Sequence, residues 1–382
     1  MSTERTSSAG TGTHNGVASS RRLVLDELRD GERFVLTTHE HPDGDALGSL
    51  AAMQQVLGAM GKDAVSFMAA DEFPLPYEYR FLELPELVTA VPADVEDRTA
   101  IFLDCGNIDR NPAEALKHAA RILNIDHHHD NTRFGSVDHV VPEASCTAEV
   151  IWDLMRALDV ELTQPIAEAL YVGLVTDTGK FMYENTGSCA HVMAAELIGA
   201  GIDVHAIYRR LYEGIPQGKL ELLARGLSAV ERFDGGLLTL TQLTREDYAA
   251  TGADESYSEG VVDHLRSVEG TAVAGLVREL LPRAERGLPR PAALPASAGG
   301  LVTTSLAASL ARPEASSPAD ASALRSPTRR KVSLRATDDR IDVSAIARAV
   351  GGGGHRRAAG FSTDMEFGEL VAFLRGQLAQ QL

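Results

Sequence analysis

The first half of the chain alternates short apolar runs with longer segments in which apolar residues recur at helical spacing. The short runs, which predict buried strands, lie at 33–38 (RFVLTT), 99–103 (TAIFL) and 121–125 (RILNI). The segments that predict helices lie at 46–60, 112–119, 146–158, 164–175 and 187–200. Alternation of this kind predicts an α/β fold in which a mainly parallel sheet is flanked by helices.

The second half of the chain also contains apolar runs that predict strands and a segment that predicts a helix, but fewer of them. Strands are expected at 236–242, 271–277 and 330–335, followed by a helix at 343–350 and a run of glycines. We therefore expect a smaller α/β domain at 226–382, separated by a linker at 213–225 from a first domain at 20–212.

Two stretches lack apolar periodicity. Residues 1–19 predict a disordered tail. Residues 284–328 are dense in Ala, Pro and Ser, which predicts a flexible low-complexity insertion within the second domain.

Composition narrows the class of protein. The chain has 382 residues, enough for two or three domains, and it contains neither a run of about 18 apolar residues nor an apolar N-terminal stretch. We therefore expect no membrane association and no secretory signal. Three cysteines without CxxC spacing argue against a disulfide framework and against a cysteine zinc site, which favours a cytoplasmic protein. A net charge of −18 disfavours binding to long nucleic acid, because such binding depends on rows of Lys and Arg.

Aspartate and histidine residues gather just after the three predicted strands of the first domain. His39, Asp43 and Asp45 follow the first strand, Asp104 follows the second, and Asp126-His127-His128 follows the third. Ligands of open α/β sheets bind at the carboxyl ends of the strands. Carboxylates with imidazoles suit cations such as Mn²⁺, Co²⁺ or Mg²⁺. Two cations about 3.5–4 Å apart need a bridging carboxylate, and Asp104 is a candidate for it.

Each of these motifs has a more ordinary interpretation when it is taken alone. The PDGD sequence around Asp43 is typical of a turn, Asp104 at a strand end is typical of a helix N-cap, and consecutive histidines occur in surface tracts. Their joint occurrence at the ends of three strands favours a metal site. Asp177, in the sequence Thr176-Asp177-Thr178, predicts by itself no more than a helix cap.

The motifs occur in the order of a known family. HEHPDGDALGS (39–49), LDCG (103–106), NIDHHHDN (124–131) and GLVTDTGKF (173–181) resemble the four motifs of the DHH phosphoesterases, and GGGGHRRAAGF (351–361) resembles the signature of the associated DHHA1 domain. Segments 144–154, 176–186 and 262–279 resemble the subgroup of bifunctional oligoribonucleases (nanoRNases) and phosphatases of 3′-phosphoadenosine 5′-phosphate (pAp). The resemblance implies a DHH catalytic domain at 20–212, a DHHA1 substrate-binding domain at 226–382 and an active site in the cleft between them.

The resemblance also implies roles for individual residues. One metal would be held by His39, Asp43, Asp104 and Asp177, and the other by Asp45, Asp104, His127 and Asp177. Mn²⁺ is usual in the family, with Mg²⁺ or Co²⁺ as alternatives. His128 would face the scissile phosphate, and Asp126 would orient the histidine pair. The residues expected to bind substrate are Arg335, Gly352, Gly353, Gly354 and His355, where the backbone N–H groups of the glycine run could form an anion nest. No role is implied for His129.

The resemblance implies a two-metal hydrolase that degrades RNA oligomers a few nucleotides long to mononucleotides and converts pAp to AMP. Two alternatives stay open, namely a cyclic-dinucleotide or pApA phosphodiesterase and a non-catalytic nucleotide sensor. The expected partners are short RNA and pAp, without long duplex nucleic acid and without a membrane. The sequence leaves a homodimer open.

Overall fold

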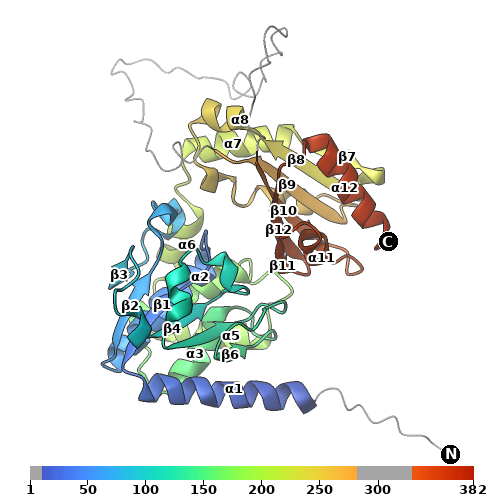
Figure 1. Ribbon diagram of the computed structural model, residues 1–382. Coiled ribbons are helices and arrows are strands. Elements are labelled where there is room, and N and C mark those ends of the chain that lie inside the picture. The colour runs from blue at the N-terminus through green and yellow to red at the C-terminus, as the bar shows by residue number, and fades with distance from the viewer. Residues whose placement is uncertain (1–10, 282–328) are drawn as a thin grey trace, which may run out of the picture. The chain divides into compact units, whose positions relative to one another are not determined.

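The computed structural model of the protein describes residues 11–281 and 329–382. The chain divides into two compact units at Gly214 and Ile215 (Figure 1). The predicted insertion at 284–328 lies outside the described residues.

The first unit is built on a six-stranded sheet in the order β3-β2-β1-β4-β5-β6, with all neighbouring strands parallel. Its strands are β1 (Arg33–Thr37), β2 (Asp63–Phe67), β3 (Leu87–Val88), β4 (Thr99–Leu103), β5 (Arg121–Asp126) and β6 (Val137–Val140). Its helices are α1 (Thr11–Asp30), α2 (Gly44–Ala59), α3 (Thr147–Ala157), α4 (Gln164–Asp177), α5 (Ser188–Gly199) and α6 (Val204–Tyr212). The predicted parallel α/β architecture is therefore confirmed.

Both faces of this sheet are buried, because strand side chains point alternately to opposite sides. Phe34 and Leu36 pack into the core that α2, α3 and α4 form, whereas Val35 packs into a smaller core on the other face. The smaller core includes Val95 and Leu116, which lie in 3₁₀ turns at Val95–Asp97 and Glu114–His118. The second turn replaces the helix expected at 112–119, since Leu116 alone among its residues is buried.

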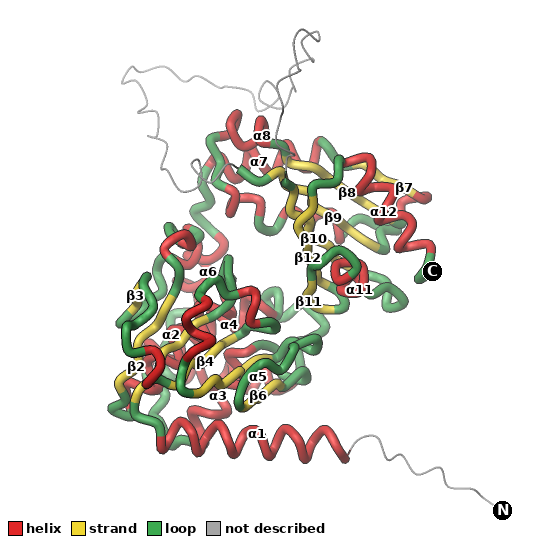
Figure 2. The backbone as a smooth tube through the Cα atoms, viewed as in Figure 1, coloured by secondary structure: helices red, strands yellow, loops and turns green. Residues whose placement is uncertain are grey.

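The helix α1 begins at Thr11, so residues 11–19 are helical where the sequence predicted a tail. Val24, Leu25 and Leu28 are buried in the core of the first unit and stabilise this helix by packing there. Extending a nucleated helix costs little, so the polar residues before them continue it. The helix runs beside β6 (Figure 2), where the Ser20 hydroxyl lies 3.0 Å from Nδ1 of His139.

The second unit contains a six-stranded mixed sheet in the order β11-β12-β10-β9-β8-β7, in which only the β8–β9 pair is parallel among the described strands. Its strands are β7 (Glu231–Phe233), β8 (Leu238–Leu243), β9 (Val273–Glu279), β10 (Arg330–Ala336), β11 (Gly353–His355) and β12 (Ala358–Thr363). Its helices are α7 (Gln217–Ser228), α8 (Arg245–Thr251), α9 (Val261–Arg266), α11 (Val343–Arg348) and α12 (Phe367–Ala379).

Two apolar clusters cover the second sheet. Leu370 and Leu374 of α12 pack in one of them with Ile346 of α11, and Leu222 of α7 packs in the other with Val261 of α9. Burial of Leu222 explains why α7 occupies most of the segment 213–225 that the sequence predicted as a linker. Among the described residues no single helix is long and apolar enough to cross a membrane; the pair α5 and α6 reaches that length and hydropathy only jointly, across a 113° bend.

Candidate metal centre

The predicted site residues of the first unit meet where three neighbouring strands end. The strands β1, β4 and β5 lie side by side and parallel, so their carboxyl ends share one edge of the sheet. His39 follows β1, Asp104 follows β4, and Asp126 is the last residue of β5. This placement explains why residues so far apart in the sequence form one cluster.

Asp43 and Asp45 are fixed by helix starts. The side chain of Asp43 caps α2 by accepting hydrogen bonds from the backbone N–H groups of Asp45 and Ala46, both at 3.1 Å. Asp45 lies in the first turn of α2, and its two oxygens accept from the N–H groups of Thr147 at 2.7 Å and Ala148 at 3.0 Å, at the start of α3. The N–H groups at this helix N-terminus favour the charged form of Asp45, but burial outweighs them and raises the pKa of this carboxyl.

Asp104 occupies the middle of the cluster and faces two histidines. Its Oδ1 atom lies 3.7 Å from Nε2 of His127, and its Oδ2 atom lies 3.7 Å from Nε2 of His39. Thr147 donates a hydrogen bond to Oδ1 at 3.0 Å. The backbone of Asp104 is left-handed, with φ of 55°, a conformation that Asp and Asn adopt more readily than other non-glycine residues. This turn directs the carboxylate into the cluster immediately after β4.

His127 joins three carboxylates. Its Nε2 atom lies 3.6 Å from Oδ2 of Asp177, 3.7 Å from Oδ1 of Asp104 and 3.9 Å from Oδ2 of Asp45. A second group is formed by His39, Asp43 and Asp104, whose candidate ligand atoms lie within 4.8 Å of one another. Asp104 belongs to both groups, while the short contact of Asp177 is with His127.

Both histidines present the correct nitrogen to a cation. Nδ1 of His39 lies 2.8 Å from the carbonyl oxygen of Glu40, and Nδ1 of His127 lies 3.3 Å from that of Ala144. A carbonyl oxygen only accepts hydrogen bonds, so each Nδ1 carries the proton. Each Nε2 lone pair is therefore available to a metal ion, which is the usual arrangement around metal-binding histidines.

The carboxylates repel one another in the metal-free protein. Burial raises the pKa of Asp104 well above its usual range, and the neighbouring carboxylates Asp45 and Asp43 add to this effect. Burial also raises the pKa of Asp177 to about 7, with Asp45 adding to the shift and His127 opposing it. A divalent cation would offset this repulsion, and a donor set of carboxylates and imidazoles suits such an ion. The residues present therefore fit a metal centre.

His128 lies beside this cluster and is held by Asp126. Its Nδ1 atom donates to Oδ1 of Asp126 at 2.7 Å and lies 3.5 Å from Oδ1 of Asp104. Burial alone would lower the pKa of His128, but the Asp126 carboxylate raises it to about 9. Asp126 also accepts from the backbone N–H of His127 at 2.8 Å and from the amide of Asn131 at 2.5 Å. Asp126 thus holds the ring of His128 and the backbone of His127.

The expected substrate-binding residues lie in the second unit. Arg335 is on β10, with Nε 3.9 Å from Oδ1 of Asp263. Gly353, Gly354 and His355 form β11, which pairs with β12. A Cβ at Gly352 would lie 2.2 Å from the carbonyl oxygen of Gly360, so close packing against β12 requires glycine there.

The predicted anion nest is restricted by these contacts. The N–H groups of Gly351 and Gly352 donate to the carbonyls of Arg348 and Ala347 at the end of α11. They are therefore not free to bind an anion.

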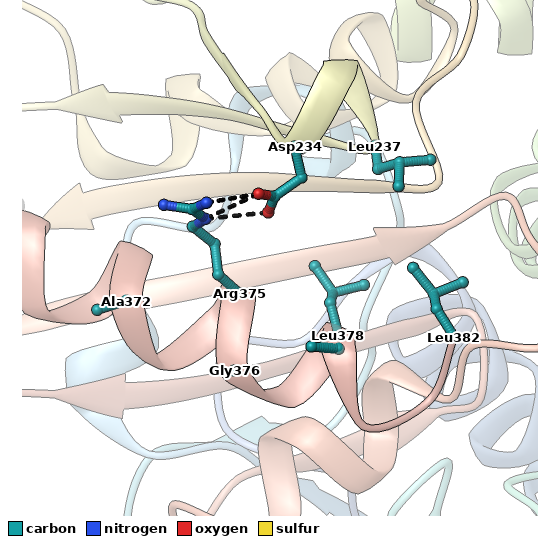
Figure 3. A pocket seen from close by; sticks show the side chains of 8 residues that line it. Asp234, Leu237, Ala372, Arg375, Gly376, Leu378 and Leu382 are labelled. Atoms are coloured by element: carbon teal, nitrogen blue, oxygen red, sulfur yellow. Dashed lines mark hydrogen bonds and ion pairs between the residues drawn. The ribbon is translucent and has the colours of Figure 1, made fainter.

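A hollow of about 490 Å³ lies elsewhere in the second unit, between α12 and the turn before β8 (Figure 3). Apolar side chains such as Leu237, Leu378 and Leu382 line it, and the ion pair of Arg375 with Asp234 lies at its side. It contains none of the residues that the sequence predicted to be functional.

Sequence reasoning missed two contributors to the metal centre. Thr147 binds both Asp45 and Asp104, and Asn185 donates to Asp177 at 3.2 Å. The aspartates and histidines were located because they directly follow predicted strands. Thr147 and Asn185 do not directly follow a strand, so this criterion could not identify them.

Comparison with known proteins identifies related chains. Residues 33–174 match the family model described as DHH family, N-terminal domain, and residues 305–380 match that of the DHHA1 domain. The bifunctional oligoribonuclease and PAP phosphatase NrnA of Thermus thermophilus is 35% identical over 266 residues, which are 68% of this chain and 76% of that protein. The probable counterpart in Streptococcus mutans is 24% identical over 251 residues, which are 64% of this chain and 79% of that protein.

A solved structure shows the same fold. An exopolyphosphatase-related protein from Bacteroides fragilis superposes with a TM-score of 0.74 at 20% identity, over 95% of this chain and 96% of the other.

Proposed function

This chain belongs to the DHH phosphoesterase family and has a DHHA1 domain, and from that premise we propose that it hydrolyses short RNA oligonucleotides to mononucleotides and converts pAp to AMP. The observation that carries the proposal is the position of Asp104, whose two oxygens each lie 3.7 Å from a different histidine. The 35% identical relative from Thermus thermophilus, named as an oligoribonuclease and PAP phosphatase, supports the choice of substrates.

Two divalent cations, with Mn²⁺ as the first choice and Mg²⁺ or Co²⁺ as alternatives, would bind at the metal centre. His39, Asp43 and Asp104 would hold one, and Asp45, Asp104, His127 and Asp177 the other; the family pattern adds Asp177 to the first set. When bound, such cations supply Lewis-acid polarisation of a phosphoryl oxygen and a nucleophile at neutral pH.

The protein's own residues would orient the substrate. His128, kept protonated by Asp126, would donate a hydrogen bond to a phosphoryl oxygen and stabilise the charge that develops there. Asp126 would hold the His128 ring in place through its 2.7 Å hydrogen bond. Arg335, Gly353, Gly354 and His355 would bind the other end of the nucleotide, whereas Gly352 would support this segment by packing against β12 and would not bind an anion through its N–H.

A short substrate is consistent with the charge of the chain. With a net charge of −18, the protein gains little from contacts to a long polyanion. A substrate of a few nucleotides would instead be bound locally by cations, His128 and Arg335. The cytoplasmic location and the homodimer remain predictions.

A substrate panel tests this proposal. The purified chain is incubated with pAp, a five-nucleotide RNA, pApA and a cyclic dinucleotide, each with Mn²⁺, with Mg²⁺ and with EDTA. We expect AMP from pAp and mononucleotides from the RNA, in Mn²⁺ and not in EDTA.

Each other outcome supports an alternative. Faster turnover of pApA or the cyclic dinucleotide would replace the proposal with the phosphodiesterase alternative. Binding of pAp without turnover in any metal would indicate a nucleotide sensor.

A further inference from the structure

Asn185 contacts the metal centre from the turn that follows α4. Its Nδ2 atom donates to the carbonyl oxygen of Ser145 at 2.8 Å, to the carbonyl oxygen of Asp177 at 3.1 Å and to Oδ2 of Asp177 at 3.2 Å. It therefore links the last residue of α4 to the segment that leads into α3.

The orientation of the Asn185 amide follows from these partners. All three are acceptors, and two are carbonyl oxygens that cannot donate, so the nitrogen must face them. The Oδ1 atom of Asn185 is then directed away; it is buried and has no hydrogen-bond partner among the described residues. A buried acceptor without a hydrogen-bond partner destabilises a fold. The hydrogen bonds that the N–H groups of Asn185 donate must therefore offset this cost.

A strained turn carries the chain from Asp177 back to Asn185. Gly179, Lys180 and Phe181 are consecutive left-handed residues, with φ of 54°, 64° and 64°. Two of them carry side chains for which this conformation is costly, and strain of this kind is concentrated at functional sites. Thr178 holds the turn closed, because its hydroxyl accepts from the N–H of Phe181 at 3.1 Å.

The turn is anchored by packing. The ring of Phe181 stacks on His191 of α5 at 5.1 Å and lies 6.4 Å from the ring of Tyr171 in α4. These contacts fix the direction in which the chain returns. Asn185 is thus placed by a turn that packs on α4 and α5, as a residue that orients a metal ligand should be supported by its neighbours.

We propose that Asn185 is a positioning residue that holds the Asp177 carboxylate in the orientation required for metal binding. Its link to Ser145 connects Asp177 to the start of α3, where Thr147 and Ala148 hold Asp45. Asn185 thereby fixes the relative positions of two carboxylates that face His127. This inference rests on the proposed function, since it takes Asp177 as a metal ligand.

Calorimetric titration of Mn²⁺ into the metal-free full-length chain tests the inference. Replacing a residue that orients a ligand typically weakens metal affinity by about 10–100-fold. We expect this loss for Asn185→Ala and also for Asn185→Leu, which keeps the side-chain volume and removes the unpaired oxygen. The circular dichroism spectra of both variants should match that of the wild type, so that the loss is specific to metal binding.

The matched control is Met182→Ala in the same turn, where the side chain is 74% exposed. It should bind Mn²⁺ as tightly as the wild type. Wild-type affinity in Asn185→Ala would overturn the positioning role. So would a loss of affinity that accompanies loss of the folded state, seen by circular dichroism, in both Asn185 variants. Failure of the wild type to bind Mn²⁺ would instead contradict the proposed function, so the two failures are distinguishable.

Discussion

The charge on Asp104 that suits metal binding also destabilises the metal-free fold. Its carboxylate is only 2% exposed and lies among other carboxylates, and its pKa is raised by burial and by Asp45 and Asp43. An acid whose pKa is higher in the folded than in the unfolded state destabilises the fold once the pH exceeds the unfolded value. The metal-free protein therefore loses stability at neutral pH through Asp104.

Replacing Asp104 with Asn should reverse that loss. Asn tolerates the left-handed backbone of this position, keeps the side-chain shape and removes the charge. We expect Asp104→Asn to melt at a higher temperature than the wild type in EDTA at pH 7, and to lose the increase in melting temperature that Mn²⁺ gives the wild type. Differential scanning calorimetry with and without Mn²⁺ measures both effects.

Asp159 provides the matched control for this substitution. It has the same left-handed backbone, with φ of 55°, but it is exposed. Asp159→Asn should leave both melting temperatures unchanged. If Asp104→Asn behaved in the same way, Asp104 would have no part in a metal centre.

At the level of elements, the helices α2 and α4 must approach closely to bring Asp45 toward Asp177. A Cβ at Gly173 of α4 would lie 2.7 Å from the Cβ of Ala148 and 2.8 Å from Oδ1 of Asp45. Gly173 therefore leaves the space in which the Asp45 carboxylate sits.

The substitution Gly173→Ala tests this packing. Overpacking of this kind typically costs about 1–3 kcal/mol, and here it also displaces Asp45. We expect chemical denaturation to show that loss, and titration to show weaker Mn²⁺ binding. Gly58→Ala in α2 is the control, because a Cβ there meets nothing within 4 Å; it should raise stability by up to about 1 kcal/mol. Equal effects of the two substitutions would contradict this account of the α2–α4 contact.

The contact of α1 with β6 introduces a pH dependence. His139 is buried there against Ser20, and burial lowers its pKa to about 4, with Arg21 adding to the shift and Asp153 opposing it. Between pH 6.5 and 4 the unfolded chain binds a proton at this histidine that the folded chain does not. Stability therefore falls as the pH falls through this range, by at most about 1.4 kcal/mol per pH unit.

The variant His139→Gln isolates this effect. Urea denaturation of both proteins in EDTA at several pH values gives the difference in unfolding free energy. We expect the difference, wild type minus variant, to decrease from pH 6.5 to pH 4. A constant difference would show that His139 does not titrate with folding.

The same elements show how far the fold can be predicted from sequence. The apolar runs of β1, β4 and β5 can be recognised in the sequence. The strand β6 (VDHV) cannot, because Asp138 and His139 interrupt its apolar pattern. These polar side chains are satisfied by Asn124 and Ser20, which are distant in sequence, so a local pattern cannot indicate the strand. The glycine run is a further case, because residues 353–355 form a strand in which a Cβ at Gly354 would lie 2.6 Å from the carbonyl oxygen of Ala358.

The candidate site was predictable to a different degree. Residues that follow strands, such as Asp104 and His127, could be located from the alternation of strands and helices together with residue chemistry. Asp177 ends a helix and was assigned only through the resemblance to the DHH family. Asn185 lies in the segment 176–186 that resembles the subgroup, but no role was predicted for it, since that role depends on the left-handed turn after Asp177, which has no apolar pattern to indicate it.

At the scale of the whole molecule, the buried acidic residues are unevenly distributed between the two units. Part of the net charge of −18 lies in buried carboxylates of the first unit such as Asp45 and Asp104, where burial disfavours the charged form. The described residues of the second unit contain no counterpart of this buried acidic cluster. The negative charge that a divalent cation would offset is therefore concentrated in the first unit.

The proposed function requires that cations held at Asp104 promote phosphoester hydrolysis. Its most direct test is the rate of phosphate release from pAp as Mn²⁺ is titrated into the metal-free full-length chain and into Asp104→Asn. Metal catalysis contributes several kcal/mol to such a reaction, which corresponds to roughly 1,000-fold or more in rate. We predict that release in the wild type rises from background as Mn²⁺ binds, and that Asp104→Asn stays slower by at least that factor. Equal rates in the two proteins, or undiminished release in EDTA, would contradict the account.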